Sequence, residues 1–86
     1  MSKFARHTWH QRERQRRITR LMARDGTCCS LCGGELDRKL VDEIDPLYIT
    51  FDHVVPLALG GADDERNMKL AHNACNNAKG DAVASG

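Results

Sequence analysis

The chain has 86 residues, of which 41% are hydrophobic and 29% charged, with a formal net charge of +1. A chain this short forms one domain and buries little apolar surface, so disulfides or a bound metal are expected to add stability. The longest apolar run, Val54 to Leu59, is interrupted by Pro56 and is too short to cross a membrane. The N-terminus carries Arg and Gln where a secretory signal would be apolar. Both features favour a cytoplasmic protein without membrane contact.

The positive charge concentrates near the N-terminus. Residues 1–24 hold eight basic side chains and one acidic side chain, a net charge of +7, whereas residues 25–86 have a net charge of −6. Residues 1–8 lack periodicity and are predicted to form a basic arm. Trp9 to Arg24 favours a helix that ends at Asp25-Gly26. Its apolar stripe consists of Ile18, Leu21 and Met22.

Arginines spaced four residues apart on this helix repel one another, so their spacing indicates that a polyanion supplies the counter-charge. A solvated helix face is the alternative interpretation of such a charge run. The arginines predicted to contact nucleic-acid phosphates are Arg12, Arg16, Arg17 and Arg20.

A cysteine knuckle follows the helix at Cys29 and Cys32, and a second pair, His72-x-x-Cys75, begins forty residues after Cys32. In a reduced compartment, two such pairs have the ligand types and the spacing of a tetrahedral zinc site. Structural zinc would contribute on the order of 10 kcal/mol of folding free energy, so we expect the apo chain to be largely unfolded. Cys28 is then a small buried or reactive thiol, and its pairing with Cys32 in place of Cys29 is the alternative.

The remaining sequence predicts an α+β arrangement. β-branched and aromatic residues favour strands, and the glycines mark turns. The expected elements are a charged loop at 35–46, a strand at 47–55, a loop at 57–66 with Gly60-Gly61 at its turn and Asp63, Asp64 and Glu65 on its exposed side, a second strand at 68–70, and a helix at 71–79 closed by Gly80.

Several of these positions fall in one register: Asp52-His53, Pro56, Gly60-Gly61, Asn67, His72-x-x-Cys75-Asn76 and Lys79-Gly80. In this register the chain resembles the HNH endonuclease family. The resemblance implies a ββα-metal (His-Me finger) nuclease core with a basic N-terminal helix and a structural zinc knuckle. The family usually has cysteine where His72 stands, and histidine is an equally good zinc ligand. The implied division is a basic arm and helix at 1–26, a nuclease core at 27–81 and a flexible tail at 82–86.

The resemblance also implies a role for each site residue. His53 is the general base, since a neutral imidazole with a pKa of about 6.5 accepts a proton near neutral pH. Asp52 and Asn76 hold one divalent ion, Mg²⁺ or Mn²⁺, and Asn67 ties the loop to the strand. Strand alternation places Asp52 and His53 on opposite faces, so their convergence requires a local twist or bulge.

Helical spacing puts residues 72, 75, 76 and 79 on one side of the last helix, so this helix braces both sites. In an alternative assignment, His72 is the final histidine of the HNH motif, and only the three cysteines bind zinc. Lys79 and Lys69 are predicted to add phosphate contacts.

The predicted function is metal-dependent hydrolysis of phosphodiester bonds in duplex DNA with weak sequence preference, by a monomer or weak dimer. In its small size the chain resembles the free-standing HNH domains that bacteriophages and bacteria encode. Some of these act beside a packaging motor and others in restriction, so the resemblance implies a packaging or restriction protein as partner. A catalytically inactive, zinc-stabilised DNA-binding or adaptor module is the alternative function. A disulfide-stapled secreted domain is a third possibility.

Overall fold

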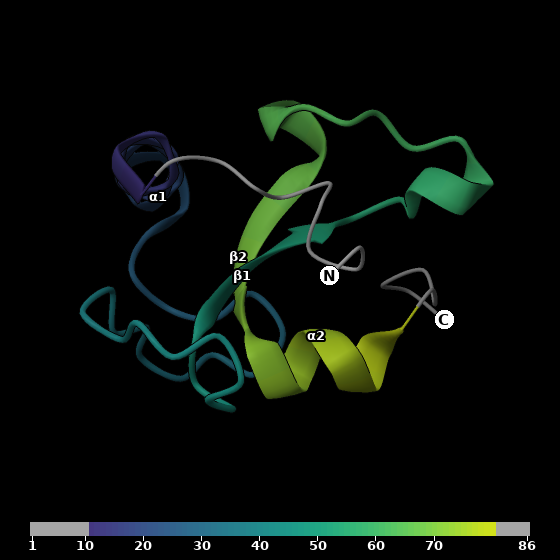
Figure 1. The fold of residues 1–86 in the computed structure, drawn as a ribbon. Helices are drawn as coiled ribbons and strands as arrows, with labels where there is room; N and C mark the ends of the chain where they lie inside the picture. Colours follow the sequence, from purple (N-terminus) through teal and green to yellow (C-terminus); the bar gives the residue numbers. More distant parts are fainter. Residues whose placement is uncertain (1–10, 81–86) are drawn as a thin grey trace.

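Two antiparallel strands form the centre of the fold (Figure 1). The structure is a computed structural model that describes residues 11–80. In it, β1 (Ile49–His53) pairs with β2 (Met68–His72), with Ile49 opposite His72 and His53 opposite Met68. The two α-helices are α1 (Gln11–Asp25), which precedes the strands, and α2 (Asn73–Lys79), which follows β2 directly. Two short 3₁₀ helices, η2 (Leu57–Leu59) and η3 (Glu65–Asn67), lie in the loop between the strands. The described fold is therefore small and of the α+β type, as predicted.

Alternate residues of β1 face different helices, because successive side chains of a strand point to opposite faces. Ile49 and Phe51 belong to the apolar core that contains the buried stripe of α1. Thr50 and Asp52 instead contact side chains of α2. The hairpin thus separates an apolar side, covered by α1, from a polar side, covered by α2.

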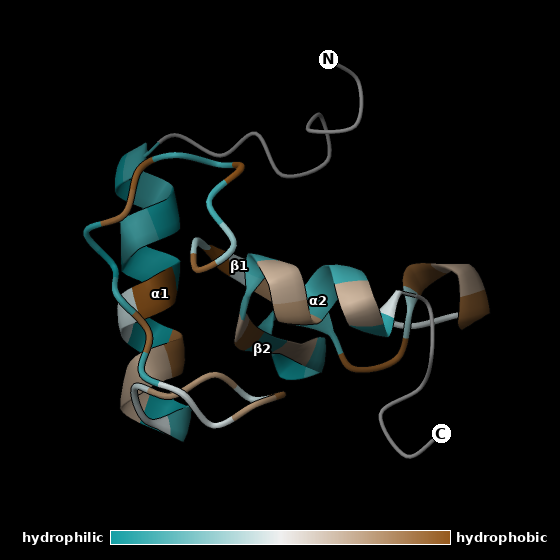
Figure 2. Ribbon diagram, turned by 90° about the horizontal axis from the view of Figure 1, so that it is seen from below, coloured by the Kyte–Doolittle hydropathy of each residue, from teal (hydrophilic) through white to brown (hydrophobic). Residues whose placement is uncertain are grey.

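The core is small and includes one candidate metal ligand. Ile18 and Leu21 of α1 are 0% and 1% exposed, which confirms the predicted stripe, and Met22 packs at its edge. Figure 2 shows that the first turns of α1 are hydrophilic and that its hydrophobic positions gather in the second half of the helix. The buried cluster consists of Ile18, Leu21, Cys29, Leu36, Ile49, Phe51, Met68, Leu70 and Ala71.

Arg14 is buried beside this core, which the sequence pattern did not predict. Its guanidinium donates a hydrogen bond to the Ile49 carbonyl and lies 4.3 Å from the centroid of the Tyr48 ring and 5.9 Å from that of Phe51. Burial lowers the pKa of Arg14 from its usual value, against the opposing effects of Tyr48 and Glu43. Arg14 therefore joins α1 to β1 by a hydrogen bond and by cation–π contacts.

The first helix ends where the sequence predicts. The Gly26 backbone N–H bonds to the Met22 carbonyl at 2.8 Å, and Gly26 has a φ of +95°, which glycine adopts without strain. Trp9, the predicted arm at 1–8 and the predicted tail at 82–86 lie outside the described residues. Between 11 and 80, no helix has the length and apolar character needed to cross a bilayer.

The second helix starts later than predicted. Ala71 and His72 pair with Thr50 and Ile49 and so extend β2, because ladder hydrogen bonds outweigh the helix propensity of alanine here. The prediction that His72 shares a helical face with residues 75, 76 and 79 is therefore wrong. The first strand is also shorter than the predicted 47–55, and residues 35–46 contain no helix or strand, as expected.

We predict that Arg14→Ala destabilises the zinc-loaded protein by about 2 kcal/mol, because it removes packing against two rings and leaves a buried carbonyl without its donor. Arg16→Ala is the matched control on the same helix, and its cost should stay below about 0.5 kcal/mol because the Arg16 side chain is 61% exposed. Urea denaturation of both variants measures the difference. Equal costs would contradict a structural role for Arg14.

Candidate metal centre and polar site

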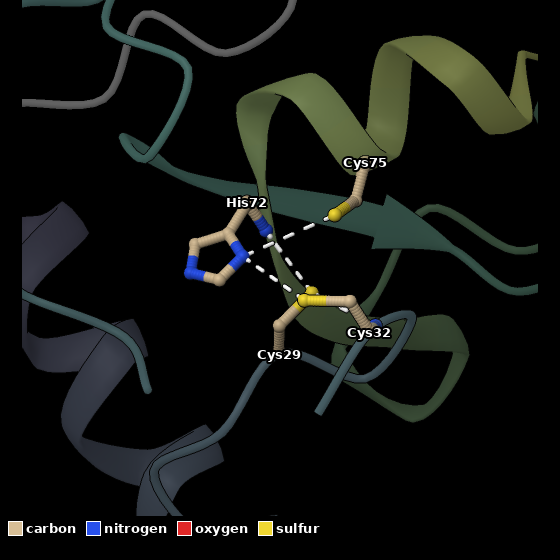
Figure 3. Close-up of side chains that lie close together, drawn as sticks. All are labelled: Cys29, Cys32, His72 and Cys75. Carbon is tan, nitrogen blue, oxygen red and sulfur yellow. Dashed lines mark hydrogen bonds between the residues drawn. The ribbon is translucent and has the colours of Figure 1, made fainter. Parts of the chain in front are cut away.

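Three sulfur atoms and one imidazole nitrogen converge where the segment after α1 meets the junction of β2 and α2 (Figure 3). The ligand atoms of Cys29, Cys32, His72 and Cys75 all lie within 4.8 Å of one another. His72 Nδ1 is 3.4 Å from the Cys32 sulfur and 3.9 Å from that of Cys75. This cluster has the ligand types of a structural zinc site and could hold a zinc ion. All four cysteines of the chain are free thiols, which disagrees with the disulfide-stapled alternative.

The outer contacts of His72 fix its tautomer. Its Nε2 lies 2.9 Å from the Glu35 carbonyl oxygen. A carbonyl only accepts hydrogen bonds, so Nε2 carries the proton and donates it, and the lone pair of Nδ1 faces the sulfurs. Metal-bound histidines commonly have this arrangement. His72 thus belongs to the cysteine cluster, in agreement with the first of the two predicted roles.

Backbone N–H groups point at the Cys29 sulfur. Burial alone would raise the pKa of Cys29, but the N–H groups of His72, Cys32 and Leu31, at 3.4 to 3.5 Å, lower it from 9.0 to about 6. The pKa of Cys75 is instead raised to about 11, by burial and by the neighbouring sulfurs of Cys32 and Cys29. A metal cation at this point would favour the thiolate of both cysteines.

Cys28 lies outside the cluster. Its side chain is exposed and its sulfur is 4.0 Å from a carboxylate oxygen of Glu35. Of the two pairings left open by the sequence, the structure brings Cys29, not Cys28, together with Cys32.

The opposite end of α2 holds a second, polar cluster against β1. Asp52 is only 4% exposed, and its two carboxylate oxygens lie 2.8 and 3.1 Å from the Lys79 ammonium. The ammonium also donates to the His53 carbonyl oxygen at 3.0 Å. Asn76, one turn before Lys79, donates to the Thr50 hydroxyl at 3.1 Å. We call Asp52, the His53 carbonyl and Lys79 the Asp52 cradle.

The contacts of this cradle differ from the expected ones. Lys79 was predicted to contact phosphate, but its ammonium is bound by Asp52. A buried carboxylate requires a counter-charge, and Lys79 at the last position of α2 supplies it. The hydrogen bond of Asn76 goes to Thr50, so the predicted pairing of Asp52 with Asn76 around a metal ion stays a prediction.

His53 contacts the loop that joins the strands. Its Nε2 is 2.9 Å from a carboxylate oxygen of Asp63, and its side chain is 11% exposed. Asp63 is exposed, as predicted, and nothing in its local sequence signals its contact with His53. β1 pairs one-to-one with β2 through His53, without a bulge, so the side chains of Asp52 and His53 leave the strand on opposite faces.

Asn67 fastens the same loop to the end of β1. Its side-chain oxygen accepts from the Val55 N–H at 3.0 Å, and its amide donates to the Val55 and Ala62 carbonyls at 2.9 and 2.8 Å. Gly61 lies so close that a Cβ atom there would stand 1.8 Å from the Val55 carbonyl oxygen. The predicted tie between loop and strand is therefore present, and glycine is required at position 61.

The arginines of α1 have counter-charges within the chain. Arg20 donates to Glu65 at 2.6 and 3.0 Å, and Arg17 lies 3.6 Å from Glu13 and 3.5 Å from Glu65. The side-chain hydrogen bond of Arg20 lowers the pKa of Glu65 below its usual value. Carboxylates of the chain therefore supply part of the counter-charge for which the sequence predicted a polyanion. DNA contact by Arg12 and Arg16, which are exposed, stays a prediction.

We predict that the protein binds one zinc ion per chain and that removing it with a chelator unfolds most of the structure. Cys29→Ser should lose the zinc and the cooperative unfolding transition. Cys28→Ser is the matched control one residue away, and it should keep both. Metal content and circular dichroism of the purified variants measure these outcomes, and zinc retained by Cys29→Ser but lost by Cys28→Ser would reverse the assignment.

Asn67→Asp should loosen the loop, because a carboxylate oxygen replaces the amide that faces two carbonyls. We expect hydrogen exchange of the Val55 amide to become faster, by the factor that corresponds to a loss of about 1–3 kcal/mol in the local free energy of opening. Asn77→Asp, on the exposed side of α2, is the control and should leave that amide unchanged. Unaltered exchange in Asn67→Asp would show that the tie is dispensable.

Comparison with known proteins identifies the family. The family model described as HNH endonuclease matches residues 29–82, which is more than half of the chain and runs from the first cluster cysteine to just beyond α2. No curated protein and no solved structure matches the chain. This chain therefore belongs to the HNH endonuclease family.

Proposed function

We propose that this protein is a metal-dependent endonuclease that hydrolyses phosphodiester bonds of duplex DNA with little sequence preference. Membership of the HNH family supports nuclease chemistry in general. The observation that carries the proposal to this chain is the Asp52 cradle, in which the Asp52 carboxylate and the backbone carbonyl oxygen of His53 already hold a cation, the Lys79 ammonium.

The donor set of the cradle fits a divalent ion. Two oxygens of Asp52 and the His53 carbonyl oxygen lie within 3.1 Å of one ammonium group. Hard oxygen ligands of this kind are those that Mg²⁺ and Mn²⁺ prefer. Asp52 would hold the ion, and Asn76, on the same end of α2, would supply a further side-chain oxygen. When bound, such an ion stabilises the negative charge that develops on the phosphate.

His53 acts as the general base in this proposal. Its contact with Asp63 restrains the ring, and a neutral imidazole can take a proton from water. Asn67 holds the end of β1 against the loop and so keeps the backbone at His53 in place. Asn67 is thus a positioning residue, and His53 is the catalytic residue.

Contacts to DNA are proposed to be made mainly with the backbone. Arg12 and Arg16 are exposed on α1, and such arginines neutralise phosphates without reading bases. Arg17 and Arg20 would first have to exchange their carboxylate partners for phosphates. Binding should accordingly weaken as the salt concentration rises.

Two observations favour the second candidate function, a zinc-stabilised DNA-binding or adaptor module without activity. Lys79 already neutralises Asp52, and only 11% of the His53 side chain is exposed. An inactive module would have no need of His53 as a base. The two functions differ in whether the protein cuts DNA when a divalent ion is present.

Relaxation of supercoiled plasmid with Mg²⁺ or Mn²⁺ tests the proposal. We expect His53→Ala to reduce the rate by about 10²-fold or more, because a general base contributes at least that factor. Asn77→Ala, on the exposed side of α2, is the control and should cut as fast as the unmodified protein. If His53→Ala cuts equally fast, the base assignment fails, and if no protein cuts with either ion, the inactive module is the better conclusion.

A further inference from the structure

We propose that Lys79 is an internal competitor of the divalent ion, so that its ammonium must leave the Asp52 carboxylate before metal can bind. This inference rests on the proposed function, because it concerns the same carboxylate. It adds a residue that determines how much metal the site requires. The nuclease would then stay inactive at low metal concentration even when its fold is complete.

The contacts of Lys79 leave no room for a second cation on the same oxygens. Its ammonium uses both carboxylate oxygens of Asp52 and the His53 carbonyl oxygen. The side chains of Lys79 and Asp52 are 8% and 5% exposed, so water screens their attraction poorly. A dication on these oxygens would lie within a few ångströms of the ammonium, and the repulsion would disfavour joint occupancy.

Lys79 can leave the cradle without unfolding the helix. It is the last residue of α2, directly before Gly80, whose N–H bonds to the Asn76 carbonyl. Rotation about the four side-chain bonds of a lysine moves the ammonium by several ångströms while the backbone stays fixed. The exchange therefore requires only a change of rotamer and the cost of separating the ion pair.

Lys69 provides a matched comparison. It lies directly opposite Asp52 in the β-ladder and is exposed. Cross-strand partners have Cβ atoms about 5 Å apart, so removing the Lys69 charge changes the general potential at Asp52. It does not remove a group from the carboxylate itself. Lys69→Met thus isolates the effect of net charge from the effect of direct competition.

The test measures Mn²⁺ binding to the zinc-loaded protein, without DNA, by electron paramagnetic resonance of the free ion. We expect Lys79→Met to bind Mn²⁺ at least about tenfold more tightly than the unmodified protein, because breaking a buried ion pair no longer opposes binding. Lys69→Met should change the affinity by less than about threefold, as expected for a surface charge. Asp52→Asn should abolish binding at this site.

The outcomes separate the two proposals. If Lys79→Met and Lys69→Met bind Mn²⁺ equally well, the competition is overturned while the proposed metal site stands. If Asp52→Asn binds as tightly as the unmodified protein, or if no protein binds Mn²⁺, the proposed metal site fails and the competition fails with it.

A measurement on the unmodified protein removes the dependence on the folding of a variant. A buried ammonium exchanges its protons slowly enough for its ¹⁵N resonance to be followed by nuclear magnetic resonance. We expect the Lys79 ammonium signal to shift or disappear as Mg²⁺ is added, while the signals of the zinc ligands stay unchanged. A Lys79 signal that persists at saturating Mg²⁺ would overturn the proposal.

Discussion

The structure depends most on the convergence of the turn after α1 with the junction of β2 and α2. Few side chains are fully buried among residues 11–80, and Cys29 is both a core residue and a member of the four-ligand cluster. A small core gives a small margin of stability, so a metal bound there would add what hydrophobic burial does not supply. His72 is the last residue of β2 and Cys75 lies in the first turn of α2. A metal bound by both would hold the start of α2 in place, and with it the polar cluster at the far end of this helix.

The two faces of the hairpin differ in polarity. On the α1 side, apolar residues and the buried Arg14 hold the helix against β1. On the α2 side, two successive contacts, Asn76 with Thr50 and Lys79 with Asp52, place polar groups in a buried setting. Each of these buried polar groups has a partner, so their burial avoids the cost of an unpaired polar group.

The sequence predicts most of what depends on local spacing and little of what depends on distant partners. The Cys-x-x-Cys and His-x-x-Cys pairs specify their ligands because the geometry of a metal ion constrains spacing directly. The start of α2 was misjudged because strand pairing with β1 is a tertiary effect. The contact of Arg20 with Glu65 has no local signal for the same reason, since the two residues lie forty-five positions apart. The contacts of Asp63 and Lys79 likewise have no local signal.

Regular pairing along β1 constrains where a scissile phosphate can lie. Because Asp52 and His53 leave the strand on opposite faces, no point above either face is equally close to both side chains. β1 ends at His53, and the chain turns into the loop at Val54. That end is the point that Asn67 fastens, through three hydrogen bonds to Val55 and Ala62. In the proposed mechanism Asn67 therefore holds the segment that directly follows His53, so the loop positions the base without touching the substrate.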